Sequence, residues 1–171
     1  MRSYFPPSNR VQREANFLCR FRHPNIVKIL GISLWLNMVG IVMEYIDGGS
    51  LDELLMGENK LAWVVRLRIA RGVASALSFI HNYKVKKSVC HGDVKCENIL
   101  LTSSLQPKLA DFGSASLRIA TGASATTLDV APTKQHTPFY TAPEYLANPS
   151  LEREPSMDVY RQVSDTVARA L

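Results

Sequence analysis

Residues 91–100 read HGDVKCENIL, and this short run decides how the rest of the chain is interpreted. Three polar side chains in it, Asp93, Lys95 and Asn98, stand close together, directly ahead of the apolar residues 99–101. A carboxylate can accept a proton, a lysine carries a positive charge, and an amide oxygen can bind a metal ion. Together these groups can handle a phosphate, its counter-ion and a hydroxyl nucleophile. What the run predicts therefore depends on the groups that the rest of the chain supplies.

The composition of the chain indicates a globular protein. Its 171 residues suit one domain of ordinary size or part of a larger one, and 46% hydrophobic with 20% charged residues can form a core. The net charge of +5 is spread out, with the densest group at Lys84, Lys86 and Lys87, which is typical of a solvated loop. We therefore expect no nucleic-acid partner.

Cysteine usage and hydropathy indicate the compartment. The three cysteines, Cys19, Cys90 and Cys96, do not suit a disulfide framework, and they lack the paired spacing of a zinc site. No signal-peptide pattern is visible, and the longest apolar run, at residues 34–43, is too short to span a bilayer. We expect a cytoplasmic protein without membrane insertion.

Hydrophobic periodicity predicts an α+β order of elements. Helices are expected at residues 10–21, 51–55, 62–82 and 157–171, and strands at residues 26–32, 39–45, 99–101 and 108–110. Ser50 and Glu53 have the spacing of a capping box at the start of the second helix. Residues 114–141 show no periodicity and are expected to form a long loop.

Two of the expected helices have an apolar side. The side of helix 62–82 that we expect in the core comprises Trp63, Leu67, Ala70, Val73 or Ala74, Leu77 and Ile80. The apolar side of the last helix comprises Val159, Val163, Val167 and Ala170.

Two further motifs complete the set of groups. Asp111-Phe112-Gly113 follows a short predicted strand, where its carboxylate can reach Mg²⁺, and Ala142-Pro143-Glu144 comes later. In this order, the run at residues 91–98, the DFG sequence and the APE sequence resemble the catalytic loop, the metal-binding motif and the end of the activation segment of eukaryotic protein kinases. The sequences HPNIVKILG and MEYIDGGSLDELL resemble the tyrosine-kinase-like or MAP-kinase-kinase-kinase-like branch, of Ser/Thr type.

The resemblance covers roughly residues 10–160 and implies a protein-kinase-like two-lobe α+β fold. It implies a partial N-lobe at residues 1–43, a hinge at residues 44–49, and a truncated helical C-lobe at residues 50–171, which includes an activation segment at residues 111–144.

The same resemblance implies ATP and Mg²⁺ as cofactors and a protein as the substrate. Asp93 would orient the substrate hydroxyl and accept its proton, and Lys95 would neutralise charge on the γ-phosphoryl oxygens. Asn98 and Asp111 would hold Mg²⁺ on the ATP phosphates.

Five residues match positions around the nucleotide. Met43 stands in the gatekeeper position, and the backbones of Glu44 and Ile46 would hold the adenine edge. Ser50 would lie near the ribose, and Leu100 would form the apolar floor under the base.

Further residues match structural positions of the family. They are Glu14, Leu18, Ile29, His91, Phe112, Glu144 and Asp158. Glu14 stands where the family has the glutamate of its αC helix, and His91 and Phe112 would stack with Leu18 and Ile29. Asp158 would brace the backbone of the catalytic loop. Thr137 belongs to the substrate-binding loop and would lie beside Asp93 and Lys95.

The sequence also departs from the family. No G-x-G-x-x-G loop and no V-A-I-K-type lysine are present, and the resemblance fades after Tyr160, so we expect a kinase that is incomplete at both ends. Gly92 replaces an arginine that in the family pairs with a phosphate, so activity should depend little on phosphorylation of the activation segment.

Two hypotheses follow from the match and the departures. The first is a protein serine/threonine kinase acting in signal transduction, with weak activity in this chain alone. The second is an inactive truncated or pseudokinase-like fragment that acts as a binding module. The sequence leaves the protein substrate and the oligomeric state open.

Overall fold

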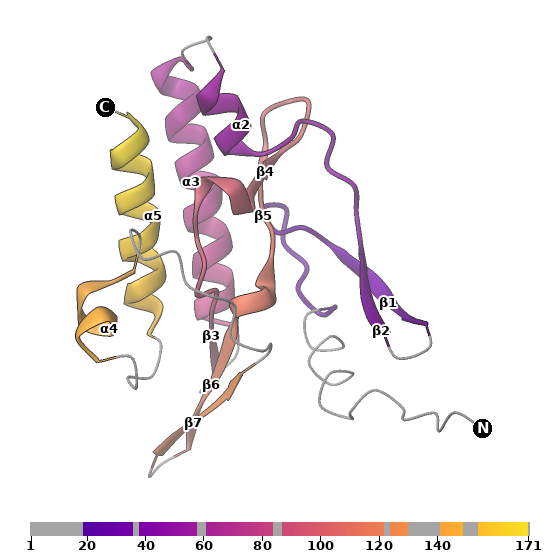
Figure 1. Cartoon of the computed structure of the whole chain (residues 1–171), viewed down its shortest axis with the longest axis vertical. Helices are drawn as coiled ribbons and strands as arrows, with labels where there is room; N and C mark the ends of the chain where they lie inside the picture. Colours follow the sequence, from indigo (N-terminus) through magenta and orange to yellow (C-terminus); the bar gives the residue numbers. More distant parts are fainter. Residues whose placement is uncertain are drawn as a thin grey trace.

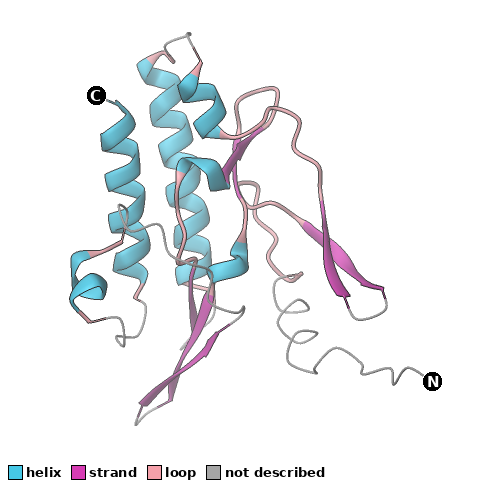
Figure 2. Cartoon of the chain, viewed as in Figure 1, coloured by secondary structure: helices cyan, strands magenta, loops and turns pink. Residues whose placement is uncertain are grey.

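A computed structural model describes residues 19–35, 38–57, 61–83, 87–121, 124–129, 141–148 and 154–170. The elements in chain order are β1 (Ile29–Trp35), β2 (Met38–Met43), α2 (Leu51–Met56), α3 (Trp63–His81), β3 (Lys87–Cys90), β4 (Ile99–Leu101), β5 (Pro107–Leu109), β6 (Ser116–Thr121), β7 (Ser124–Asp129), α4 (Pro143–Ala147) and α5 (Pro155–Ala170). In Figure 1, α3 and α5 lie side by side, and the β1–β2 pair lies on the opposite side of β4 and β5. Figure 2 shows the helices gathered in one part of the molecule and the strands bordering them, which confirms the α+β class.

The β1–β2 pair begins later along the chain than the periodicity predicts. The strands pair antiparallel from Ile29 opposite Met43 to Trp35 opposite Met38. The predicted first strand included Ile26, but this residue forms a bridge to Leu109 of β5 instead. The residues just before Ile29 therefore connect the β1–β2 pair to β5.

The cap of α2 confirms the predicted capping box. The backbone N–H of Glu53 donates to Ser50 Oγ at 3.1 Å, and the backbone N–H of Ser50 donates to Glu53 Oε2 at 2.9 Å. These two bonds satisfy two backbone donors that the helix itself cannot satisfy. The start of α2 is therefore fixed directly after the glycines at positions 48 and 49.

α3 confirms the longest predicted helix, and Val73, Leu77 and Ile80 of its predicted core side are buried, but the N-terminal part of that side is not. Its buried residues are Ile69, Val73, Ala76, Leu77 and Ile80. Trp63 and Leu67 were part of the predicted core side, yet they are 64% and 52% exposed, and Ala74 is exposed as well. Among the described residues, the elements that pack on α3 are chiefly β3, β5 and α5, and they cover its middle and C-terminal turns.

The predicted loop at residues 114–141 is wrong in its first half. β6 pairs antiparallel with β3, from Ser116 opposite Cys90, and with β7 on its other edge. Polar and apolar residues alternate over the first four residues of this strand, SLRI, which is the period of a strand. This alternation is the signal that the Ser/Thr-rich composition of the segment conceals.

α5 confirms the last predicted helix, but not the side that it buries. Val159 is 48% exposed, whereas Met157, Asp158 and Arg161 are buried. The predicted apolar side is therefore wrong at Val159, and the buried side carries two charged side chains, whereas the side chains of Val163, Val167 and Ala170 lie outside what the structure describes. Their partners lie in the loop between β3 and β4.

Aromatic rings connect that loop to the rest of the core. The His91 and Phe112 rings lie 4.7 Å apart, and Phe112 packs edge-on against Phe21 at 5.6 Å. Ile29 belongs to the same buried cluster, whereas Leu18 lies outside the described residues. Phe21, which the periodicity assigned to the first helix, is therefore the ring that contacts Phe112.

The hydrogen bonds of His91 fix its tautomer. The backbone N–H of Asp93 donates to Nδ1 at 3.3 Å, so Nδ1 carries no proton. Nε2 lies 2.9 Å from the carbonyl oxygen of Ala110, which can only accept, so Nε2 carries the proton. His91 is fully buried, and this burial lowers the pKa of its imidazole, partly offset by the nearby Asp158 carboxylate. The ring is held in its neutral form.

We predict that the free energy of unfolding decreases as the pH falls below about 6.5, the ordinary value for histidine. In this window the unfolded chain takes up a proton that buried His91 resists, so stability decreases by up to about 1.4 kcal/mol per pH unit for each such proton. Urea unfolding between about pH 7 and pH 5 measures this slope.

His91→Phe should reduce the slope, because it removes the buried titrating group and keeps an aromatic ring. Burial also lowers the pKa of His23, but that residue is only half-buried, so His23→Phe should reduce the slope less. A parental slope in His91→Phe would contradict the prediction.

Gly48 is placed where no side chain fits. Its N–H donates to the carbonyl oxygen of Leu101 at 2.9 Å, and a Cβ atom there would lie 2.4 Å from the same oxygen. The Leu101 oxygen belongs to the backbone and a Cβ atom is bonded directly to Cα, so neither can rotate away. This close approach holds the segment between β2 and α2 against β4.

We predict that Gly48→Ala lowers the free energy of unfolding by about 1–3 kcal/mol, as overpacking in a well-packed region does. Gly57→Ala is the matched control, because a Cβ atom there meets its nearest neighbour at 3.4 Å and the residue has an ordinary negative φ. Equal urea midpoints for the two variants would contradict the prediction.

Candidate active site

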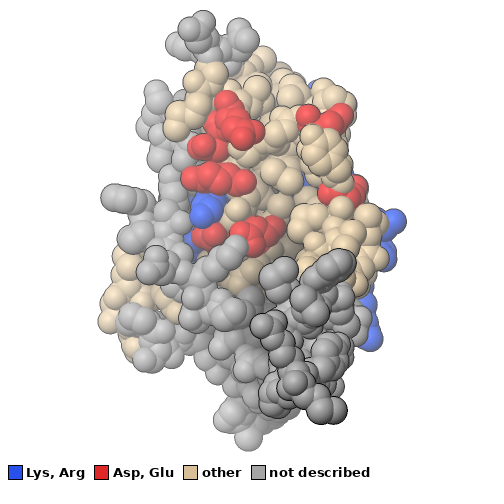
Figure 3. All heavy atoms as spheres, turned by 45° about the vertical axis from the view of Figure 1, so that its right-hand side comes forward, with Lys and Arg blue, Asp and Glu red and all other residues tan. Residues whose placement is uncertain are grey.

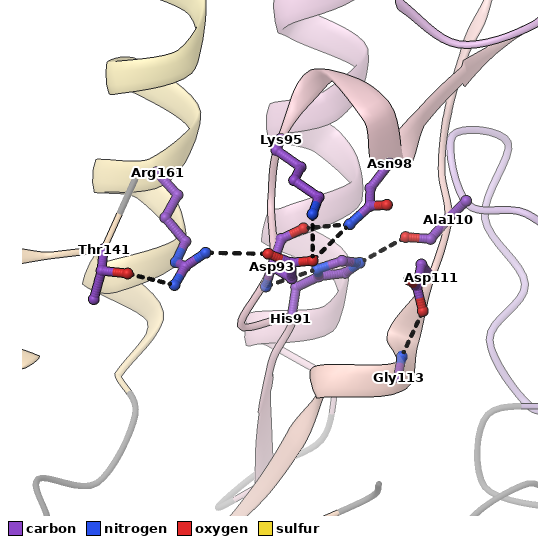
Figure 4. Close-up of polar contacts among 9 residues, drawn as sticks. All are labelled: His91, Asp93, Lys95, Asn98, Ala110, Asp111, Gly113, Thr141 and Arg161. Atoms are coloured by element: carbon purple, nitrogen blue, oxygen red, sulfur yellow. Dashed lines mark hydrogen bonds and ion pairs between the residues drawn. The ribbon is translucent and has the colours of Figure 1, made fainter. Parts of the chain in front are cut away.

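The loop between β3 and β4 brings Asp93, Lys95 and Asn98 into direct contact (Figure 4). Lys95 Nζ lies 3.1 Å from Asp93 Oδ2, and the side-chain amide of Asn98 donates to the same oxygen at 3.0 Å. The Asn98 amide also donates to the backbone carbonyl of Asp93 at 2.8 Å. Asp93 and Asn98 are buried and Lys95 is half-buried. The opening run of the sequence therefore forms one hydrogen-bonded cluster around a carboxylate.

Asp158 on α5 holds the backbone of this loop. Its two carboxylate oxygens accept the N–H groups of His91 at 2.7 Å and Gly92 at 2.8 Å. His81, at the end of α3, contacts the same carboxylate through Nε2 at 2.9 Å. Gly92 has a φ of +78°, a conformation that favours glycine. The turn before Asp93 thus depends on Asp158 and on the absence of a side chain at position 92.

Asp111 follows β5 and lies near the end of the same cluster. Its φ of +57° is unusual for a residue with a side chain, and its Oδ1 accepts the N–H of Gly113 at 3.1 Å. The N–H of the preceding Ala110 donates to the backbone carbonyl of Asn98 at 2.8 Å. This bond joins the loop that carries Asn98 to the segment that carries Asp111.

The oxygen donors of Asn98 and Asp111 suit Mg²⁺. In Figure 4 the amide nitrogen of Asn98 points toward Asp93, so its oxygen points away from that carboxylate, toward the side on which Asp111 lies. Within the described ranges, no group of three or more His, Cys, Asp or Glu side chains could hold a metal by itself. Such a sparse donor set suits Mg²⁺, which keeps several waters and binds through one or two protein groups together with phosphates.

The segment between β2 and α2 lies along β4 and brings Ser50 next to Leu100. The two residues form an antiparallel bridge, and the N–H of Leu101 donates to the carbonyl of Gly49 at 2.9 Å. Ser50 Oγ already caps α2, so any ribose contact would be additional to the cap. Met43, at the end of β2, is 46% exposed.

Glu44 uses its backbone and its side chain in different directions. Its N–H donates to the carbonyl of Lys28 at 2.9 Å, and its carboxylate accepts from Lys108 Nζ and from the Lys28 N–H, both at 2.8 Å. Burial raises the pKa of Glu44, but these bonds outweigh it and lower the pKa overall. The side chain of Glu44 is therefore engaged with β5. Within the described part of the chain, no backbone hydrogen bond uses Ile46.

The remaining predicted residues are placed as follows. Ile29 is buried, and Glu144 is exposed in the first turn of α4. Glu14, Leu18 and Thr137 lie outside the described residues.

Arg161 and Thr141 complete the cluster, and the sequence-based prediction missed both. Arg161 Nη1 donates to Asp93 Oδ1 at 3.3 Å, and its Nη2 donates to Thr141 Oγ1 at 3.1 Å. A signal for Arg161 exists in the sequence, because it follows Asp158 by three residues and so lies on the same side of a helix. The prediction assigned the buried side to the valines and overlooked it.

The charge on the surface is uneven. Figure 3 shows acidic side chains gathered on one face, with a basic side chain between them, and the described residues form no continuous basic patch on that face. None of the described helices is long and apolar enough to span a bilayer.

Comparisons with known proteins agree with this geometry. Residues 3–161 match the protein kinase domain family. The chain is 40% identical over 154 residues to U-box domain-containing protein 33 of Arabidopsis thaliana, an alignment that covers 87% of this chain and 17% of that protein. It is 38% identical over 151 residues to the probable serine/threonine-protein kinase PBL10 of Arabidopsis thaliana, with coverage of 86% and 35%.

A third relative comes from an animal. The chain is 41% identical over 117 residues to interleukin-1 receptor-associated kinase 1 of Bos taurus, with coverage of 66% and 16%. The chain thus spans between 16% and 35% of the length of these three relatives. The family match extends over most of the 171 residues and includes the whole cluster around Asp93. The chain therefore belongs to the eukaryotic protein kinase family and has its α+β fold.

Proposed function

We propose that this chain carries the catalytic site of a protein serine/threonine kinase, which transfers the γ-phosphoryl group of ATP to a protein hydroxyl in signal transduction. The observation that carries the proposal is the cluster of buried Asp93 and Asn98 with half-buried Lys95, joined to the Asp111 segment by the bond from Ala110 to Asn98. Phosphoryl transfer needs positioning and charge neutralisation more than covalent help from the protein. A fixed carboxylate, a cation and two oxygen donors meet these needs.

Each residue of the cluster has one role in the proposed reaction. Asp93 orients the substrate hydroxyl and takes its proton as the hydroxyl oxygen forms a bond to the γ-phosphorus and the bond to the leaving ADP breaks. Lys95 neutralises charge on the transferring group. Asn98 and Asp111 would hold Mg²⁺, which would offset the negative charge of the phosphates.

We also propose the lobe boundaries and the nucleotide contacts. Residues 1–43 and 50–171 belong to the two lobes, and residues 44–49 form the hinge. The pairing of Ser50 with Leu100 supports an adenosine site beside β4, and the family match assigns the backbone of Ile46 to it. Met43, the Glu44 backbone and Thr137 are assigned to the nucleotide and the substrate by the family match alone.

A second function is a binding module without phosphoryl transfer. One sequence feature favours it: Gly92 replaces the arginine that the family has at this position. Both functions allow nucleotide binding, but only the first requires Asp93 as a proton acceptor. Phosphoryl transfer that depends on Asp93 therefore separates them.

We predict that Mg²⁺ and ATP together raise the melting temperature of the full chain and that Asp111→Ala removes this shift. A ligand that binds only the folded state stabilises it by RT ln(1 + [L]/Kd), which is about 2.7 kcal/mol at a ligand concentration of 100 Kd. A thermal scan with each component alone and with both together measures the shift.

Glu97→Ala is the matched control, because Glu97 is an exposed acid on the same loop that the proposal does not use. It should keep the shift. A folded parental chain whose melting temperature is unchanged by millimolar Mg²⁺ and ATP would show that the nucleotide site is not formed.

We predict that Asp93→Asn lowers phosphoryl transfer at least about a hundredfold, because general-base catalysis contributes about 10²–10⁴ in rate. The amide keeps the shape of the side chain but cannot accept the proton. Transfer of radiolabelled phosphate to a generic protein substrate measures the rate. Nucleotide-induced stabilisation without Asp93-dependent transfer would favour the binding module.

A further inference from the structure

We propose that Arg161 is a positioning residue for Asp93 and supplies, from α5, the contact that holds the second oxygen of the reacting carboxylate. This inference rests on the proposed function, because it assigns Arg161 a role in the same reaction. Nothing in the motifs of the sequence gives Arg161 this role.

The contacts of Asp93 show what Arg161 adds. Oδ2 is held by Lys95 and by the amide of Asn98, both within the same loop. Oδ1 accepts from Arg161 Nη1. A carboxylate can rotate about its Cβ–Cγ bond, and contacts on both oxygens from different elements stop that rotation. In Figure 4, Arg161 approaches Asp93 from α5, whereas Lys95 and Asn98 approach it from the loop.

Thr141 fixes the other end of the guanidinium. Arg161 Nη2 donates to Thr141 Oγ1 at 3.1 Å, just ahead of α4. The guanidinium is planar and its two terminal nitrogens are a fixed distance apart, so an anchor on one determines where the other points. The side chain of Arg161 is only 5% exposed, which leaves it little freedom to move.

A comparison with Asp158 shows that Arg161 does more than attach α5 to the loop. Asp158 lies on the same side of α5, three residues earlier, and it already binds the loop through the N–H groups of His91 and Gly92. Arg161 instead contacts the side chain that reacts. Gly92 has no side chain to make this contact, and a small cavity borders Gly92, Thr141 and Arg161. The cation on this side of Asp93 therefore comes from α5.

The first test is a double-mutant cycle on stability, which needs no activity. Urea unfolding is measured for the full chain, for Asp93→Asn, for Arg161→Met and for the double variant. A guanidinium buried without its carboxylate is destabilising, so each single change should lower stability by more than it does when the other is already present. We expect a coupling of about tenfold in the unfolding equilibrium constant, which is about 1.4 kcal/mol. Additive effects would overturn the inference.

The second test is kinetic. Arg161→Met should lower kcat for protein phosphorylation about tenfold to a hundredfold, because a small misplacement of a reacting group has an effect of this size. The KM for ATP should stay within about twofold, since Arg161 has no assigned nucleotide contact. Arg161→Lys keeps the charge without the planar fork, so its kcat should lie between those of the parent and of Arg161→Met. Thr141→Val removes only the anchor and should lower kcat less than Arg161→Met does.

Gln162→Leu is the matched control for packing of α5. Gln162 Nε2 donates to the carbonyl of Ala70 at 3.1 Å, so this change weakens the contact between α5 and α3 without touching Asp93. Its stability should fall and its kcat should stay within about twofold of the parent. A kcat loss as large as that of Arg161→Met would overturn the inference, because general loosening of α5 would then explain both.

Failure of the proposed function gives a different result from failure of this inference. If the parent and Asp93→Asn both lack transfer while the cycle shows coupling, the kinase proposal fails and Arg161 retains only its hold on Asp93. If transfer depends on Asp93 but Arg161→Met and Arg161→Lys leave kcat unchanged, the kinase proposal stands and the positioning role is overturned.

Discussion

The buried carboxylate of Asp158 is the contact on which the site depends. It is nearly inaccessible to water, and its oxygens accept the N–H groups of His91 and Gly92 and face His81 of α3. A buried charge is tolerated only when hydrogen bonds replace its lost water. The loop must therefore adopt the turn that presents two successive N–H groups to α5. That turn places His91 in the core and directs Asp93 toward the side chains of Lys95, Asn98 and Arg161.

The electrostatics of the site follow from one side of one helix. α5 buries Asp158 and, three residues later, Arg161. Asp158 binds the backbone of the loop, and Arg161 binds the side chain of Asp93. The two charges offset one another locally, and each has polar partners in place. Burying both is thus compatible with a stable fold, whereas an isolated buried charge would not be. The same arrangement explains why Val159 need not face the core.

The sequence predicted which polar residues of the loop lie together better than it predicted how the helices pack. Asp93, Lys95 and Asn98 contact one another because a short loop forces neighbouring residues together, so their spacing alone is informative. The cap at Ser50 and the helix Trp63–His81 could also be predicted, since caps and helices depend on residues close together in sequence. Which side of α3 or α5 is buried depends on distant elements, so Leu67 and Val159 were assigned wrongly.

Two further differences have the same origin. Ile26 fits a strand by composition, but its partner is Leu109, more than eighty residues away, and not the next strand. Arg161 meets Asp93 across 68 residues of sequence. A charged residue on a helix is usually solvated, and that Arg161 is buried becomes evident only once its partner is located in the fold. Contacts of this kind are set by the topology and cannot be read from local periodicity.

The sheet formed by β3, β6 and β7 links two segments that act at different points of the site. β3 leads directly into the loop of Asp93, and β6 follows directly after Asp111-Phe112-Gly113. The ladder from Cys90 opposite Ser116 to Lys87 opposite Ile119 holds these segments to one another. A displacement of either segment would have to break this ladder or carry the other segment with it. If binding at one segment is coupled to the other in this way, the coupling free energy must be the same in both directions.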